Sequence, residues 1–304
     1  MGLRRKFNLA ILVTFLVGFL TTGLLLNSRF EKDARETVLQ SARIMMTSAN
    51  AVRHYTSKEV TPVLGYEQDG KFLSASVPAF AARFHFDDIK ADFPDYSYRE
   101  ATLNPTNLAN RTTDWEADIV NTFRQPRGTI GGGVQREIIS ERVTPTGTWL
   151  NLARPIVVPD ASCLKCHGQP SQAPASMKAV YGAANGFGWH VNEVIGAQIV
   201  SLPLSVPLGK ARHTLLLFLL LLTSVFIVMT VIFNVLLHYL IVRPVTKISA
   251  IATEVSLGHE AEQLKPAGKD EISALCGAFN RMRRSLDQAM KMLDEHEPPA
   301  RANA

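Results

Sequence analysis

Two stretches of the chain are apolar along their whole length, from Asn8 to Leu26 and from Thr214 to Val242, and neither contains Asp, Glu, Lys or Arg. A helix of about 20 apolar residues crosses the roughly 30 Å hydrocarbon core of a bilayer. Helices of soluble proteins keep a polar face, whereas the run LLLFLLLLTSVFIVMTVIFNVLL within the second stretch has none. We therefore predict transmembrane helices at residues 7–27 and 214–241.

The first apolar run also fits a cleaved signal peptide, because three basic residues precede it: Arg4, Arg5 and Lys6. Two observations favour a retained anchor. The stretch from Leu24 to Arg29 offers a poor small-x-small cleavage site, and the run is longer than the apolar part of a usual signal peptide. Whether the first span is ever cleaved stays open at this point.

Basic residues flank both spans on the same side, at positions 4–6 before the first and at Arg243 and Lys247 after the second. By the positive-inside rule, both termini are cytoplasmic, including the short segment 1–6, and residues 28–210 lie outside. The formal net charge of +5 is small and lies partly in these flanks. No nucleic-acid partner is expected.

The pattern between the spans changes from helical to strand-like. Apolar residues recur every three or four positions first, and alternating strand-like runs follow a Gly-rich link. We expect helices at 30–63, 79–93 and 113–123, a link at 128–133, and strands at 133–143 and 148–158. Two further strands are expected within 187–205. This order predicts an α+β sensor domain of PAS type.

After the second span, apolar residues again step by three and four, which is the pattern of heptad seams. The seam runs through Val245, Ile248, Ala252 and Val255, breaks from Gly258 to Asp270, and resumes at Ile272. Two short helices cannot bury both seams alone, so we expect a parallel homodimer that forms an all-α four-helix bundle over 242–296. A disordered tail is expected at 297–304.

The sequence Cys163-Leu-Lys-Cys166-His167 carries the chemistry of the outside segment. Two thiols one helical turn apart can add to the two vinyl groups of haem, and the next histidine is then held under the iron. We predict one covalent haem c, with Cys163 and Cys166 as thioether positions and His167 as the proximal iron ligand.

Three other interpretations of the motif compete with haem. A redox disulfide usually follows a strand at a helix start in a thioredoxin-like order, which is missing here. A structural zinc site needs four ligands, and the chain has three cysteines in all, with Cys276 in the cytoplasmic tail. A plain disulfide leaves His167 unexplained.

Residue type alone does not identify the sixth iron ligand, which is usually a thioether or an imidazole. We name Met177, His54 and Met46 as distal candidates, and Met45, His85 and His190 as further ones. An open or labile sixth position permits NO, CO or O2 to bind, whereas a filled one favours redox sensing. No nucleophile, base and orienting group belong together in the sequence, so an enzyme is not expected.

Several segments resemble the PAS-like c-haem sensor domains that precede HAMP segments in bacteria: FPDYSYREATLNPTNLANRTTDWEADIV, TPTGTWLNLARPIVV, CLKCHG, APASM and YGAANGFGWHVNEVIGAQIVSLPLSVP. The resemblance covers about 60 to 210. It implies a haem pocket formed by the PAS-like sheet, and a bacterial inner-membrane receptor with a periplasmic sensor. Some relatives use a cysteine as the distal ligand, but the outside segment has no third cysteine.

The cytoplasmic segment resembles a HAMP domain, with Arg243-Pro244 at the start of its first helix and Asp270-Glu271-Ile272 at the start of its second. Pro is tolerated in a first helical turn, and acidic residues suit a helix N-terminus. This implies a haem-based redox or gas sensor that relays signals across the membrane. The chain ends shortly after Leu293, so we expect a partner in trans or a truncated receptor.

Two alternative functions stay open from the sequence. A membrane-tethered electron-transfer cytochrome would need no heptad relay. A receptor for a small organic molecule would use the haem as a structural group.

Overall fold

The fold is described from a computed structural model of the 304-residue chain, for all residues except 1, 126–136, 260–261, 266–267 and 297–304. The chain divides into two compact units. One comprises residues 24–216, and the other comprises residues 1–23 and 217–304. Each unit is described by itself.

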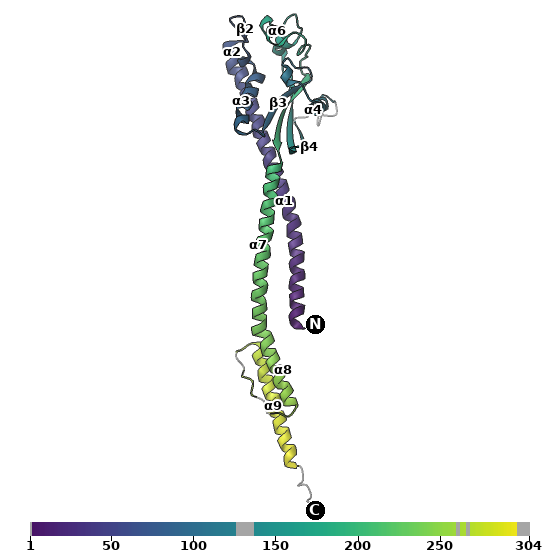
Figure 1. Ribbon diagram of the computed structural model, residues 1–304, viewed down its shortest axis with the longest axis vertical. Coiled ribbons are helices and arrows are strands. Elements are labelled where there is room, and N and C mark those ends of the chain that lie inside the picture. The colour runs from purple at the N-terminus through teal and green to yellow at the C-terminus, as the bar shows by residue number, and fades with distance from the viewer. Residues whose placement is uncertain (1, 126–136, 260–261, 266–267, 297–304) are drawn as a thin grey trace, which may run out of the picture. The chain divides into compact units, whose positions relative to one another are not determined.

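The larger unit is built on a four-stranded antiparallel sheet in the order β3-β6-β5-β4 (Figure 1). The central strand β6 has the largest share of buried residues, whereas no residue of the edge strand β4 is fully buried. The register places Glu100 of β3 and Arg154 of β5 opposite Gln198 of β6. The strands are β3 (Ser97–Thr102), β4 (Ile138–Thr144), β5 (Gly147–Val157) and β6 (Val194–Pro203).

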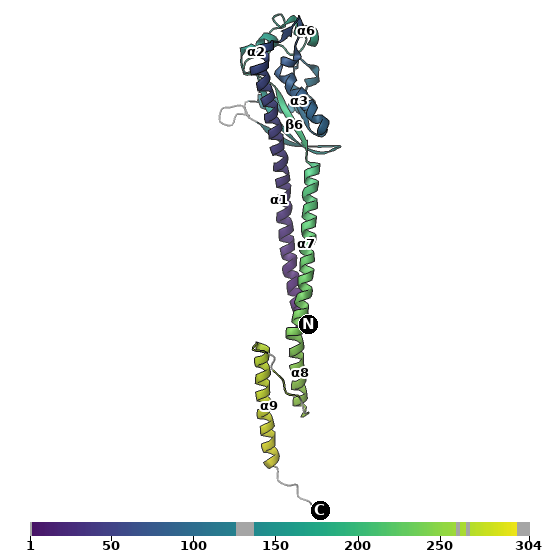
Figure 2. The same cartoon turned by 90° about the vertical axis from the view of Figure 1, so that its left-hand side faces the viewer.

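One face of the sheet packs against α1 (Leu3–Tyr55) and α3 (Pro78–Asp92) (Figures 1 and 2). A stripe of apolar residues at three-to-four spacing on α1 contacts this face: Val38, Ala42, Met46 and Ala49. After α1 the chain continues as a π-helical segment (Thr56–Val60), α2 (Thr61–Leu64), the short strands β1 (Glu67–Gln68) and β2 (Lys71–Phe72), and a 3₁₀ turn (Ser74–Ser76).

The opposite face of the sheet is covered by α4 (Asp114–Arg124), which follows a 3₁₀ turn at Leu108–Asn110 (Figure 1). A capping box begins this helix, because the Glu116 carboxylate accepts from the backbone N–H and the hydroxyl of Thr113. The same carboxylate lies 2.9 Å from Nε of Arg99 on β3. A buried apolar cluster on this face consists of Ile119, Val120 and Phe123 from α4 with Ala101, Ala153, Val194, Ala197 and Ile199 from the sheet.

The segment between β5 and β6 holds a 3₁₀ turn (Ala161–Cys163), α5 (Leu164–His167) and α6 (Ala175–Tyr181). The prediction of two strands within 187–205 is wrong, because only β6 forms there. Residues 187–193 turn instead, with positive φ angles at Gly188 and Asn192. The backbone N–H groups of Gly188 and Trp189 donate to the carbonyls of Gly168 and His167 rather than to a neighbouring strand.

The smaller unit contains the start of α1 and, from residue 217, the helix α7 (Ser205–Leu237), side by side in both views (Figures 1 and 2). Within the described chain, these two helices are long and apolar enough to cross a membrane. The ring of Phe15 stacks on Phe226 with centroids 3.7 Å apart. The side-chain amides of Asn8 and Asn234 donate to each other's oxygens at 3.1 and 3.0 Å.

A π-helical segment (His238–Val242) joins α7 to α8 (Arg243–Ser256), and α9 (Glu271–His296) follows. A small apolar cluster links these helices through Ile248, Leu264, Cys276 and Phe279. Both predicted helices are present, and the described residues of the predicted break, which are those other than 260–261 and 266–267, are not helical. Several seam residues of α9, among them Leu275, Met282 and Leu286, are exposed in the single chain.

The mixed α and β fold between two candidate membrane helices is confirmed. The predicted link at 128–133, the first part of the predicted strand 133–143 and the predicted tail at 297–304 lie outside the described residues. The domain boundaries stay predictions.

Candidate functional site

The CxxCH motif forms a single helical turn. Cys163 ends the 3₁₀ turn and immediately precedes α5, which contains Cys166 and His167. Side chains three residues apart on a helix lie on the same side, so the two thiols lie along one edge of the turn. Both cysteines are free and half-buried. The turn ends at Gly168, whose N–H donates to the carbonyl of Leu164 at 2.8 Å.

The imidazole of His167 is fixed by its Nδ1 atom. Nδ1 lies 2.9 Å from the carbonyl oxygen of Gly186 and 3.2 Å from the hydroxyl oxygen of Thr106. A carbonyl oxygen only accepts, so Nδ1 carries the proton and Nε2 keeps its lone pair. Burial lowers the pKa of His167, although the Gly186 carbonyl opposes that shift. The ring is therefore held neutral, with Nε2 able to bind a metal.

Trp189 covers one face of the same ring. The centroids of the His167 and Trp189 rings are 3.9 Å apart, with an angle of 11° between their planes. The Trp189 N–H also donates to the His167 carbonyl at 3.1 Å. Backbone bonds and ring stacking together leave the imidazole little freedom to rotate.

Gly186 brings the loop after α6 against the loop after β3. Its φ is +82°, and a Cβ there would lie 2.0 Å from the hydroxyl oxygen and 2.7 Å from the backbone of Thr106. Its N–H donates to the Asn104 side chain at 3.0 Å. Only glycine fits this close approach. The carbonyl that holds His167 therefore depends on the absence of a side chain at 186.

Other groups lie near the two thiols. Burial raises the pKa of the Cys166 thiol, and the neighbouring Cys163 adds to the rise. The pKa of Tyr66, in the segment between α2 and β1, is raised by burial and then by the charges of Cys166 and Cys163. The hairpin that follows Tyr66 contacts α6, because Ser176 donates to Glu67 at 2.6 Å and the Phe72 and Tyr181 rings meet edge to face.

The predicted distal candidates occupy different surroundings. Met46 is fully buried in the apolar core between α1, α3 and the sheet, which is the usual place of a methionine that fills space. Met177 is buried on α6, and His54 is exposed on α1. Met45 packs against the core that contains Met46.

The two further histidine candidates have partners of their own. Nε2 of His85 lies 3.1 Å from the Ser48 hydroxyl on α1. His190 is strongly exposed, with Nδ1 3.5 Å from a Glu193 oxygen. The identity of the sixth ligand stays a prediction.

Three residues around the imidazole were not predicted from the sequence: Thr106, Gly186 and Trp189. Each contacts His167 across a loop, and no periodicity reports contacts between residues 61 or 19 positions apart. The sequence Gly186-Phe187-Gly188 was the available signal, because two glycines so close together indicate a turn or loop rather than a strand.

The side chains of Cys163, Cys166 and His167 can be compared with what a covalent haem requires. Across the described residues, no three His, Cys, Asp or Glu side chains gather to hold a metal ion. A haem iron has no such need, because the porphyrin supplies four nitrogens and the protein supplies one or two axial ligands. A neutral imidazole with Nε2 unprotonated, beside two free thiols on one helical turn, fits a haem joined through thioether bonds.

Two family models match separate parts of the chain. A family described as Tll0287-like matches residues 31–203, which is more than half of the chain, and a HAMP domain matches residues 236–288. A solved structure titled as that of the cyanobacterial heme-protein Tll0287 is 18% identical, covers 55% of this chain and 95% of its own, and has a TM-score of 0.42. No curated protein matches.

Proposed function

Since the chain belongs to the Tll0287-like family and also contains a HAMP domain, we propose that it is a membrane receptor whose sensor domain binds one covalent haem c. In this proposal Cys163 and Cys166 form the thioether bonds and His167 is the proximal iron ligand. The tethered His167 imidazole, with its protonated Nδ1 on the Gly186 carbonyl, is the observation that carries the proposal.

The residues around His167 have defined roles in this site. A hydrogen bond from Nδ1–H to a carbonyl fixes the tautomer and makes the other nitrogen a better ligand. Trp189 holds the ring plane, Thr106 places its hydroxyl beside Nδ1, and Asn104 accepts from the N–H of Gly186. Haem iron supplies a reversible one-electron change and, where its sixth position is open, a binding site for NO, CO or O2.

The connection from the site to the membrane helix is short. Trp189 contacts His167, and β6 begins at Val194 and crosses the centre of the sheet to Pro203. The helix α7 begins two residues later at Ser205, and the N–H of Leu204 donates to Thr148 on β5. A displacement at His167 therefore reaches α7 through one continuous strand, and a HAMP bundle with two packings turns it into a signal.

The proposed placement follows the positive-inside rule: the receptor lies in the bacterial inner membrane, its sensor is periplasmic and both of its termini are cytoplasmic. The exposed seam residues of α9 would pack in a homodimer. The output would act on a signalling protein in trans. A haem-regulated receptor of this kind needs no catalytic group of its own.

The proposal is tested on the full chain in membranes, produced with a cytochrome maturation system. Leu286→Cys places a thiol in the α9 seam, and Gln288→Cys places one on another face, both with Cys276→Ser. We expect disulfide crosslinking at 286 that changes between oxidised and reduced haem, and little at 288. If crosslinking at 286 is the same with oxidised and reduced haem, the result would favour the alternative function, an electron-transfer cytochrome. Loss of the haem-dependent change in His167→Ala is the control.

A further inference from the structure

A polar cluster continues the buried apolar stripe of α1. The stripe steps by three or four through Ala42, Met46 and Ala49, and the next position on the same face is Arg53. A charged residue at a core position must find an opposite charge, because an unpaired buried charge is costly.

Arg53 finds that charge on the sheet. Its Nη1 lies 2.6 Å from both carboxylate oxygens of Glu100 on β3. The Glu100 side chain is 7% exposed and that of Arg53 is 26% exposed. Burial alone would lower the pKa of Arg53, but the charge and hydrogen bonds of Glu100 outweigh burial and raise it. The Arg53 guanidinium is therefore held as a cation against the Glu100 carboxyl group.

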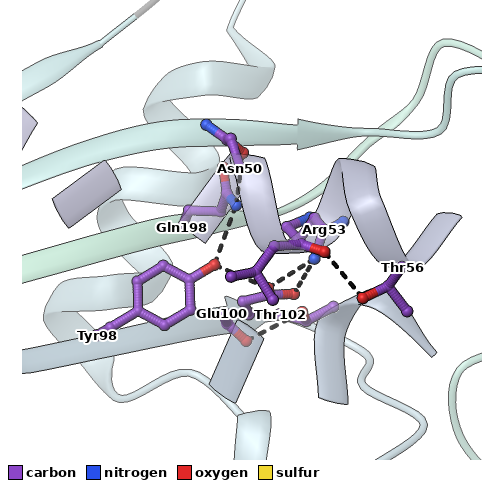
Figure 3. A network of polar contacts seen from close by, with 8 residues as sticks. Asn50, Arg53, Thr56, Tyr98, Glu100, Thr102 and Gln198 are labelled. Atoms are coloured by element: carbon purple, nitrogen blue, oxygen red, sulfur yellow. Dashed lines mark hydrogen bonds and ion pairs between the residues drawn. The ribbon is translucent and has the colours of Figure 1, made fainter. Parts of the chain in front are cut away.

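Neighbouring side chains fix the position of this pair (Figure 3). The Tyr98 hydroxyl donates to Glu100 at 2.8 Å, and Gln198 on β6 donates to the Tyr98 oxygen at 3.0 Å. The same Gln198 amide donates to Asn50 on α1 at 3.1 Å. The cluster thus joins α1 to the two strands β3 and β6 and holds both charges at defined places.

The cluster lies at the haem-site end of the sheet. The strand that carries Glu100 ends at Thr102 and leads directly to Thr106, which contacts His167. In the chain without haem the charge of Cys163 contributes to the raised pKa of Arg53, which indicates that the two side chains lie near each other. Charges held near the proposed thioether edge in a poorly solvated site act strongly on the iron.

We propose that the Arg53–Glu100 pair sets the reduction potential of the haem. Both residues act through their charges, and neither is an iron ligand. The inference rests on the proposed function and deepens it. A cation near the iron disfavours the more positive oxidised state and raises the potential, whereas an anion lowers it. In the pair the two effects oppose each other, so the potential at which the receptor changes state depends on the balance between the two charges.

The test is a redox titration of the haem-loaded full chain, followed by absorption with soluble mediators. Glu100→Gln leaves Arg53 charged and should raise the potential. Arg53→Gln leaves Glu100 charged and should lower it. Each shift should be at least tenfold in the ratio of reduced to oxidised haem at a fixed applied potential, which is about 59 mV for one electron. The double variant should lie between the two single variants.

Glu116→Gln is the matched control, because Glu116 has a carboxylate of similar burial, paired with Arg99, and lies in α4 on the opposite face of the sheet. Its potential should stay at the wild-type value. Shifts of one sign in both single variants, or none, would overturn the inference. So would loss of haem from Glu100→Gln alone while Glu116→Gln keeps it, because the pair would then be structural.

If Arg53→Gln fails to fold, Glu100→Gln decides the matter by itself. Gln keeps the volume of Glu100 and an oxygen that accepts from Arg53 and Tyr98, so this variant is the one expected to fold. A wild-type protein without haem would instead overturn the proposed function and the inference with it. A loaded wild type with unmoved variants overturns the inference alone.

Discussion

The carbonyl oxygen of Gly186 lies 2.9 Å from Nδ1 of His167, and the two residues are 19 positions apart in the chain. This contact determines which nitrogen of the imidazole carries the proton. It also ties the loop after α6 to the helical turn that contains both thiols.

Gly186→Ala should disturb this contact. The added Cβ would collide with Thr106, including its backbone, which cannot move aside as a side-chain tip can. We expect a changed haem spectrum and a lower haem content, measured by absorption per mole of protein. Gly182→Ala is the control, because Gly182 has a similar φ of +80° but nothing within 4 Å of the added atom. It should cost about 1–3 kcal/mol of stability through backbone strain alone. Equal spectra in both variants would contradict this role of Gly186.

Trp189→Ala should loosen the imidazole. Aromatic stacking contributes about 0.5–1.5 kcal/mol beyond burial, and the two rings are nearly parallel at 3.9 Å. We expect the bond between iron and His167 to break at lower urea concentration, followed in the Soret band. Trp189→Phe keeps an aromatic ring and should lie between Trp189→Ala and wild type. An unchanged midpoint in Trp189→Ala would show that stacking does not hold the ring.

The helices and the motif were predictable from sequence, and the surroundings of His167 were not. Periodicity located α1, α3, α4 and the HAMP helices because each has one buried face. The two family resemblances are confirmed by the matches at 31–203 and 236–288. The strand expected before β6 is wrong because residues near Trp189 bond to α5 instead. Contacts between loops, such as those around His167, produce no periodic pattern of apolar residues in the sequence. Arg53 is an exception, because a charged residue that continues an apolar stripe indicates a buried ion pair.

Stability should depend on pH through Glu137, which contacts Arg43 on α1 at 2.6 Å and Arg154 on β5 at 3.4 Å. The hydrogen bond from Arg43 is the main cause that lowers the Glu137 pKa. Because the pKa of Glu137 is lower in the folded state, its ionised carboxylate stabilises the fold at pH values above its ordinary pKa of 4.5. That contribution is lost as the pH falls through the lower folded-state value.

The measurement is thermal unfolding of wild type and Glu137→Gln at several pH values. We expect the variant to be less stable at pH 7 by under about 1 kcal/mol, because the pair is partly exposed. The difference should disappear well below pH 4.5. Glu141→Gln removes the more exposed pair with Arg35 and should change stability less. A difference that grows on acidification would contradict this sign.

The reciprocal amide pair of Asn8 and Asn234 should couple the two membrane helices. Polar pairs between helices in a bilayer contribute about 0.6–2 kcal/mol. We expect Asn8→Ala and Asn234→Ala each to lower the unfolding temperature in detergent. The double variant should be little worse than either single one, since one interaction is lost in all three. Additive losses would show that the two amides act independently.

The covalent attachment of haem to Cys163 and Cys166 is the central claim, and intact-protein mass spectrometry under denaturing conditions tests it most directly. The full chain, produced with a cytochrome maturation system, should carry the added mass of one haem that acid and organic solvent do not remove. The double variant Cys163→Ala, Cys166→Ala should lack that mass. A wild-type chain with the mass of polypeptide alone, or with haem that the solvent extracts, would contradict the account.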